Sequence, residues 1–320
     1  MKCTLREYRN WVKNLIKRHL PNCMNNFPQR NFQEPDYTAG LAIGLPKLLN
    51  TDKIATCCGL RFGGCFIHQK PYVTYMGTTK PVTRELGDLL VLCRERHEKE
   101  ERFNAALLQL KMAKDRCKQV ESGQLKIYTE WPAFSIGRQC VPKSLYDVYP
   151  KTVTQGALYS FVHKPDKASP LRFTVASPDE MLIRNGIDRT DGMQLQEFLA
   201  DFVIWQSGRA ISSRQKHRKD PWSHLIWDIV EQLRGVMFKR KRISNNGIAR
   251  FNREHGAFFD FLLSEEQIKD PIQDEAKAKP LNDDWAGVLG MLFIDKDLKG
   301  CEYPGESDEV FIAKKGRHRE

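Results

Sequence analysis

The fold is decided by two apolar stretches, Glu85-Leu86-Gly87-Asp88-Leu89-Leu90-Val91-Leu92-Cys93 and Asn104-Ala105-Ala106-Leu107-Leu108-Gln109-Leu110-Lys111. The charged segment 94–102 joins them as a solvated turn or as an extension of the strands. We expect the two stretches to form adjacent β-strands. Burying an acid, an amide and an amine on such strands costs several kcal/mol unless these groups are paired or bind a metal. The pattern therefore predicts a functional site.

Strand periodicity places the polar groups of the second stretch together. Residues 109 and 111 point to the same face because side chains alternate along a strand. Asp88 meets them across the ladder if the two strands are neighbours. Phosphodiester cleavage with a divalent ion needs a carboxylate that holds the metal and a cation that polarises the attacking water or stabilises the developing charge. The alternative interpretation is a structural salt bridge between Asp88 and Lys111 at a strand end.

This arrangement resembles the PD-(D/E)xK nuclease superfamily, in the variant that has glutamine at the middle position. Asp88 matches the aspartate of the motif, Gln109 the variable position and Lys111 the lysine, while Gly87 stands where the name-giving proline would be. The resemblance covers roughly residues 30–140. It implies an α/β fold, with a mixed central sheet flanked by helices (a restriction-endonuclease-like core) and the motif on its central strands.

The resemblance also implies ligands and a cofactor. Asp88 and Gln109 would hold Mg²⁺ or Mn²⁺, since an amide oxygen is also a hard ligand. Members of the family often add a glutamate from the preceding helix. Glu34 matches that position best, with Glu7 and Glu85 as alternatives. The catalytic residues implied are thus Asp88, Gln109, Lys111 and Glu34.

Residues 1–150 are expected to form the nuclease-like core and residues 151–320 a mostly helical, basic C-terminal domain. Apolar spacing predicts helices over 4–20, 36–50, 122–131, 195–205, 222–236 and 257–263. Alternation and β-forming residues predict two or three strands within 54–76, and further strands over 133–136, 156–162, 171–175 and 288–294. The charged, proline-bearing segment 270–284 is expected to be a loop.

The formal net charge of +11 favours a polyanionic partner, and nucleic acid, DNA above all, fits best. Two basic stretches flank a helix whose Trp222 and Trp227 are expected to be buried. Clustered lysine and arginine bind phosphates without sequence preference, and a solvated loop is the alternative for each stretch. The nucleic-acid-binding candidates are Arg214, Lys216, Arg218, Lys219, Lys239, Arg240, Lys241 and Arg242.

Other signals narrow the function. No stretch is apolar over the roughly 20 residues that a membrane helix needs, and the irregularly spaced cysteines favour reduced thiols, so a cytoplasmic protein is expected. The chain has no phosphate-binding G-x-x-x-x-G-K-[ST] motif, so a motor or other protein subunit would have to supply any energy-driven step. Zinc at Cys57, Cys58, Cys65 and His68 is a weaker alternative, because the spacing lacks paired C-x-x-C clusters.

The sequence thus predicts a metal-dependent endonuclease that acts in defence against phage or plasmid DNA or in mobile-element control. The alternative is a catalytically silent nuclease-fold subunit that binds nucleic acid or a partner within a larger complex.

Overall fold

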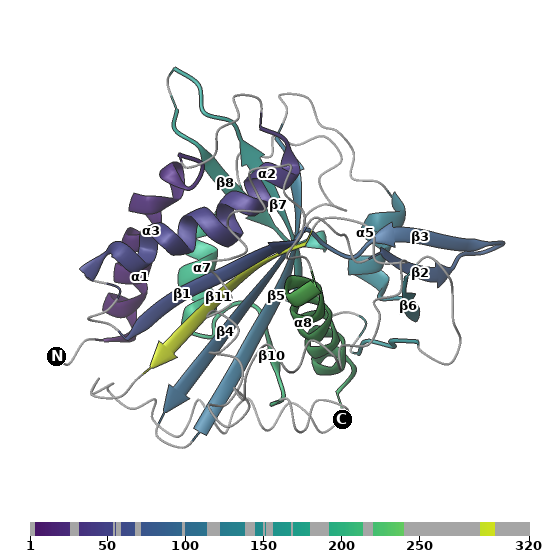
Figure 1. Cartoon of the computed structure of the whole chain (residues 1–320). Helices are drawn as coiled ribbons and strands as arrows, with labels where there is room; N and C mark the ends of the chain where they lie inside the picture. Colours follow the sequence, from purple (N-terminus) through teal and green to yellow (C-terminus); the bar gives the residue numbers. More distant parts are fainter. Residues whose placement is uncertain are drawn as a thin grey trace.

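The computed structural model describes residues 4–25, 32–53, 55, 59–67, 72–97, 100–113, 122–137, 145–149, 151, 156–167, 169–179, 192–213, 220–239 and 289–297. Within them an eight-stranded mixed sheet forms the centre of the molecule (Figure 1). Its order is β1-β11-β4-β5-β7-β8-β9, and β10 pairs with β5. The strands are β1 (Leu60–Ile67), β4 (Leu89–His97), β5 (Glu100–Met112), β7 (Ala157–His163), β8 (Arg172–Ala176), β9 (Met193–Gln194), β10 (Arg209–Ile211) and β11 (Leu289–Asp297).

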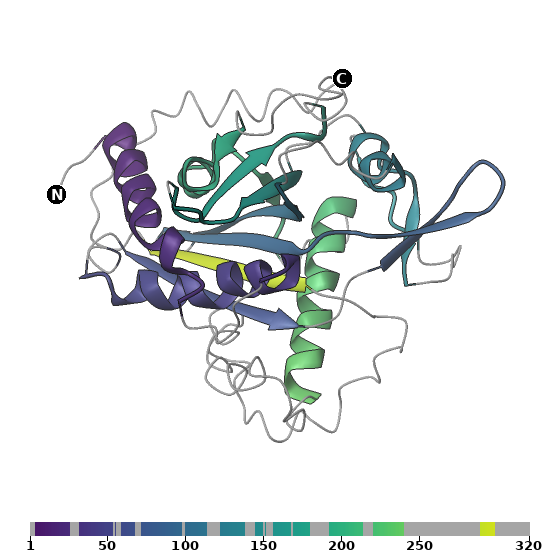
Figure 2. The same ribbon diagram turned by 90° about the horizontal axis from the view of Figure 1, so that it is seen from above.

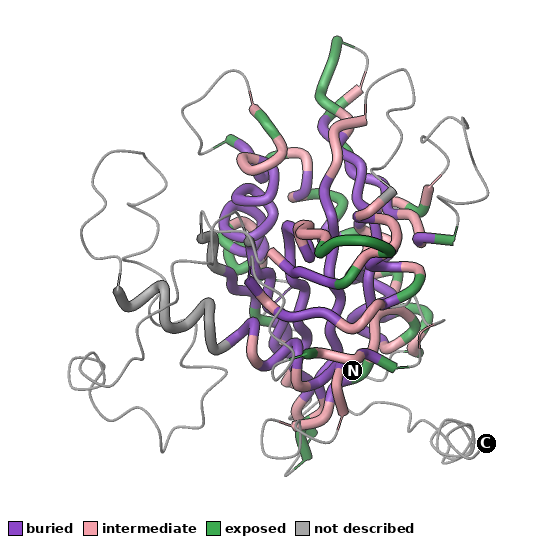
Figure 3. The backbone as a smooth tube through the Cα atoms, turned by 90° about the vertical axis from the view of Figure 1, so that its right-hand side faces the viewer, coloured by how far each residue is buried: buried purple, intermediate pink, exposed green. Residues whose placement is uncertain are grey.

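The two stretches that decide the fold form the central antiparallel pair β4 and β5. Their register runs from Leu89 opposite Leu108 to His97 opposite Glu100, so the charged connector extends both strands. Residues 89–95 are all buried, because cores lie on both faces of the sheet. Figure 3 shows the buried backbone at the centre of the molecule. A strand covered on both faces has a continuous apolar run rather than an alternating one, which explains the sequence of β4.

Two layers of helices enclose the sheet (Figures 1 and 2). One core contains residues of α1 (Leu5–His19), α2 (Glu34–Ala39), the π-helical segment η2 (Gly40–Gly44), α3 (Leu45–Thr51) and α7 (Leu195–Val203). The other core contains residues of α5 (Ser122–Glu130) and α8 (Pro221–Lys239). The α/β class with a mixed sheet flanked by helices is therefore confirmed.

Most of the predicted helices are present with small changes at their ends. The helix expected over 36–50 begins at Glu34 and passes through α2, η2 and α3 to Thr51, and Pro46 is the second residue of α3. A capping box between Thr4 and Glu7 fixes the start of α1. The helices predicted over 195–205 and 222–236 correspond to α7 and α8, and Trp222 and Trp227 are buried as expected.

The strands predicted within 54–76 belong to two different sheets. β1 lies at the edge of the main sheet, whereas β2 (Tyr72–Met76) pairs with β3 (Pro81–Glu85) and β6 (Phe134–Ile136) in a small three-stranded sheet. The hairpin of β2 and β3 projects from the body of the molecule (Figures 1 and 2).

The main sheet continues across residue 150. β7 pairs with β5 in parallel, and β11 lies between β1 and β4. After residue 150 the described residues contribute five strands and two helices, so they are mixed rather than mostly helical. They show no division at residue 150, and the separate C-terminal domain stays a prediction. The helix expected over 257–263 and the loop over 270–284 lie outside the described residues.

Gly64 on β1 marks a close contact between the sheet and η2. A Cβ atom there would collide with the backbone oxygen of Ala42 and would lie 2.6 Å from that of Met291. Because neither backbone can move alone, we expect Gly64→Ala to lower the free energy of unfolding by about 3 kcal/mol, measured by urea denaturation. Gly123→Ala is the control, since its Cβ would meet the Arg84 side chain, which can move. Equal stability of the two variants would contradict this expectation.

Candidate active site

Asp88 lies directly before β4, where the backbone is held from both sides. Its N–H donates to the oxygen of Leu108 on β5 at 2.9 Å, and its carbonyl accepts from the N–H of Gly290 on β11 at 2.8 Å. Asp88 is 5% exposed. The two neighbouring strands, β5 and β11, therefore fix the position of this acid before any ligand is considered.

The carboxylate of Asp88 contacts Gln109 and the backbone of β5. Its Oδ2 atom accepts from the N–H of Leu110 at 2.9 Å and from Nε2 of Gln109. Gln109 is fully buried, and its Oε1 atom has no hydrogen-bond partner among the described residues. A buried acceptor without a donor costs about 1–3 kcal/mol, which makes it a candidate ligand atom.

Tyr128 on α5 positions the segment that leads into Asp88. Its hydroxyl donates to the oxygen of Leu86 at 2.5 Å, and a Cβ atom at Gly87 would lie 3.0 Å from that hydroxyl. This close approach accounts for the small residue at position 87. Burial first, and then the charges of Tyr159 and Asp88, raise the pKa of Tyr128 well above its usual value, so the hydroxyl stays a donor.

Lys111 and Glu34 lie together where β5 ends. Glu34 is the first residue of α2, and its Oε1 atom accepts from the N–H of Met112 at 3.0 Å. Its Oε2 atom is 3.9 Å from Nζ of Lys111, and both side chains are about one-third exposed (34% and 28%). The ion pair found for Lys111 is thus with Glu34, whereas the structural alternative paired it with Asp88.

The two rival glutamates have other positions. Glu7 caps α1 through Thr4, and these hydrogen bonds, from the backbone first and then the side chain, lower the pKa of Glu7. Glu85 ends β3, opposite Tyr72. Of the three candidates, Glu34 is the one that the structure places beside Lys111.

The residues present offer oxygen atoms suited to a hard divalent ion. Within the described part of the chain, no three histidine, cysteine, aspartate or glutamate side chains are grouped to hold a metal. The candidate oxygen ligands are instead the Asp88 carboxylate and the unpartnered amide oxygen of Gln109, and the Glu34 carboxylate lies further along β5 at the N–H of Met112. Oxygen donors of this kind, completed by water, fit Mg²⁺ or Mn²⁺.

The remaining candidates lie outside the described structure. This holds for residues 214–219 and 240–242 of the basic stretches, and the side chain of Lys239 is also not described. It holds as well for Cys57, Cys58, His68 and the side chain of Cys65. Nucleic-acid binding by the basic stretches and zinc binding therefore stay predictions.

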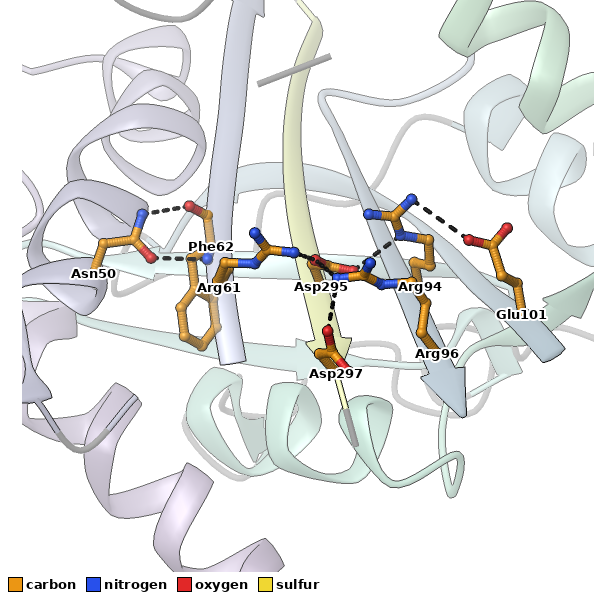
Figure 4. A network of polar contacts seen from close by, with 8 residues as sticks. All are labelled: Asn50, Arg61, Phe62, Arg94, Arg96, Glu101, Asp295 and Asp297. Atoms are coloured by element: carbon orange, nitrogen blue, oxygen red, sulfur yellow. Dashed lines mark hydrogen bonds and ion pairs between the residues drawn. The ribbon is translucent and has the colours of Figure 1, made fainter. Parts of the chain in front are cut away.

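Sequence reasoning missed a second polar cluster, at the opposite end of β4 and β11 (Figure 4). Asp295 is 1% exposed and accepts from three arginines. These are Arg61 at 2.5 Å, Arg94 at 2.9 Å and Arg96 at 3.0 Å. The signal was a pair of complementary charge triplets, Arg-Glu-Arg at 94–96 and Asp-Lys-Asp at 295–297, which lie in register.

Glu95 and Lys296 form the middle pair of these triplets. They are joined at 2.5 Å and are both 2% exposed, and Trp205 donates to the same carboxylate at 3.0 Å. Burial acts to raise the pKa of Glu95, but Lys296 and Arg102 outweigh it, so the pKa lies below its usual value. Each carboxylate of this cluster is paired with at least one cation within the protein, which favours a structural role.

Comparison with known proteins gives one partial similarity. No protein-family model and no solved structure matches this chain. The chain is 30% identical over 118 residues to a glycerol-3-phosphate acyltransferase of Pasteurella multocida (strain Pm70). The matched segment is 35% of this chain and spans only 14% of the acyltransferase. Among the described helices, none has the length and apolar character needed to cross a membrane.

Proposed function

We propose that this protein is a Mg²⁺- or Mn²⁺-dependent nuclease that hydrolyses phosphodiester bonds, with DNA as the preferred substrate. The proposal is supported by two contacts along the last residues of β5, Asp88 with Gln109 and Glu34 with Lys111, and by a buried amide oxygen of Gln109 without a donor. A restriction-endonuclease-like core is part of the same proposal. A match over 14% of an acyltransferase carries no activity over to this chain.

Each residue has a role in this proposal. Asp88 and Gln109 would hold the ion, and Glu34 would assist. The bound metal supplies Lewis acidity at the scissile phosphate and a more acidic water. Lys111 is partly exposed and carries a positive charge, so it would orient the attacking water or stabilise charge on the phosphate. Glu34 would hold the ammonium group of Lys111 near the end of β5 until the substrate phosphate replaces the Glu34 carboxylate as its partner.

A silent nuclease-fold subunit is the second candidate, and one observation favours it. Oδ2 of Asp88 already accepts two hydrogen bonds from its own chain, and glutamine brings no negative charge to the site. Such a subunit would bind nucleic acid or a partner protein without cutting. In either form, we propose a cytoplasmic role in defence or mobile-element control, with a motor or other subunit as a partner.

The test is cleavage by the purified full-length chain with Mn²⁺, on single- and double-stranded DNA and RNA. We expect cleavage by the wild type and a loss of about 100-fold or more in Lys111→Ala, because charge on the transition state loses its partner. Lys126→Ala is the matched control, since this exposed lysine pairs with Glu130 on α5. The nuclease proposal would be overturned if the wild type does not cleave and if a substitution at Asp88 leaves the Mn²⁺ affinity unchanged.

A further inference from the structure

The β2–β3 hairpin ends in an exposed tip that the site described above does not use. The tip consists of residues 76–81, where the N–H of Gly77 donates to the oxygen of Lys80 at 3.0 Å and closes the turn. Met76 and Pro81 are the last paired residues before this turn, and both are exposed, Met76 by 60%. The tip projects from the body of the molecule (Figure 2). Its methionine and proline face each other across the two strands and are exposed, so they do not belong to the core.

The base of the hairpin is firmly anchored, in contrast to its tip. The hydroxyl of Tyr75 donates to the oxygen of Gly123 on α5 at 3.1 Å, and the hydroxyls of Thr74 and Thr83 are joined across the strands at 2.9 Å. Thr74 also donates to the oxygen of Gly137 at 2.8 Å. The small sheet and α5 thus hold the hairpin in one direction, and its tip extends past them (Figure 1).

The hairpin leads directly into the candidate active site. β3 ends at Glu85, and Asp88 follows after only two residues. Lys80 precedes Asp88 by eight residues, so the tip lies at most about 29 Å from the acid. One turn of duplex DNA is about 34 Å long. The tip therefore lies within the length of one helical turn of a scissile phosphate placed at Asp88.

The chemistry of the tip suits a groove of nucleic acid. A two-stranded β-ribbon fits the major groove, and architectural proteins insert methionine or proline between base steps from the minor groove. Lys80 stands beside the apolar pair, and the chain carries a net charge of +11. Nucleic acid offers phosphates that attract Lys80 and base steps that Met76 and Pro81 can contact. An acidic protein surface would offer a partner only for Lys80.

We infer that the β2–β3 hairpin enters a groove of duplex DNA, where Met76 and Pro81 press against a base step and Lys80 contacts the backbone phosphates. The inference rests on the proposed function for the place of the DNA at Asp88. It adds a second contact, remote from the chemistry, that selects duplex over single-stranded substrate and bends it.

The test measures binding of the full-length protein to a fluorescent 30-base-pair DNA duplex without divalent metal, so that no cleavage intervenes. We expect Met76→Ala to weaken duplex affinity about tenfold and to remove the bend reported by energy transfer between the duplex ends. Lys80→Ala should reduce the slope of log affinity against log salt by about one. Met193→Ala is the matched control, because this methionine on β9 is also exposed (46%) and should leave both readouts unchanged.

The failure of this inference differs from the failure of the nuclease proposal. Wild-type duplex affinity and bending in Met76→Ala would overturn the groove contact, as would absence of duplex binding by the wild type. A change in self-association or in binding to a protein, with duplex binding intact, would also overturn it. If Met76 governs duplex binding but no variant of Asp88 affects cleavage, the groove contact stands and the nuclease proposal falls.

Discussion

The Asp88→Asn variant is expected to cleave nucleic acid about 100- to 1000-fold more slowly than the wild type and to lose Mn²⁺ binding. Asparagine keeps the shape of the side chain, and its oxygen still accepts from the N–H of Leu110. The fold should therefore survive, while the negative charge that would hold the ion is lost. Cleavage rates and calorimetric titration with Mn²⁺ measure the two effects separately.

A matched carboxylate tests whether this effect is specific. Glu130 at the end of α5 is exposed and pairs with Lys126, so Glu130→Gln removes one negative charge away from the site. We expect wild-type cleavage and wild-type Mn²⁺ affinity from this control. Unchanged cleavage in Asp88→Asn would exclude Asp88 from the chemistry. Mn²⁺ binding that depends on Asp88, without any cleavage by the wild type, would favour the silent subunit.

The Asp295→Asn variant is expected to lose about 3–5 kcal/mol of the free energy of unfolding. Asp295 is almost completely buried and supports three arginines, one of which, Arg94, is only 6% exposed. Removing one partner of a buried ion pair leaves the other charge uncompensated, and the cost is of this size. Urea denaturation followed by circular dichroism gives the change from the shift in midpoint.

Asp297 provides the control for this prediction because it carries the same charge two residues along β11. It lies 3.1 Å from Arg96, but its side chain is 27% exposed. Solvent screens such a pair, so we expect Asp297→Asn to cost about 1 kcal/mol or less. Equal losses in the two variants would mean that burial of Asp295 does not set the strength of the cluster.

The central pair of strands could be predicted, because the two strands are close in the sequence and pair with each other. β4 and β5 are apolar, nearly adjacent in the sequence and joined by a connector that suits a hairpin, so their adjacency follows from the chain itself. The convergence of Asp88 and Gln109 then follows from strand geometry. Glu34 was found through the resemblance, and the structure places it beside Lys111.

The position of β11 in the sheet could not be predicted, because the strands that flank it, β1 and β4, lie far away in the sequence. An apolar segment near 290 indicates a strand, but periodicity does not say which strands flank it. The complementary triplets at 94–96 and 295–297 indicate that β11 and β4 are neighbours, but they bring unlike charges opposite one another in either direction, so they do not determine that the pairing is parallel. Charged residues are usually predicted to be exposed to solvent. Glu95, Asp295 and Lys296 are buried instead, so the sequence pattern does not reveal their positions.

The insertion of β11 between β1 and β4 has a consequence for synthesis in the cell. Until residues 289–297 leave the ribosome, β1 and β4 each present an edge with no β11 to pair with. At about 5–20 residues per second, this exposure lasts for many seconds, during which unpaired edges favour aggregation. The hydrogen bond from the N–H of Gly290 to the carbonyl of Asp88 also cannot form until β11 has been made. A nascent chain therefore completes the backbone hydrogen bonds around its candidate active site only after β11 has been made.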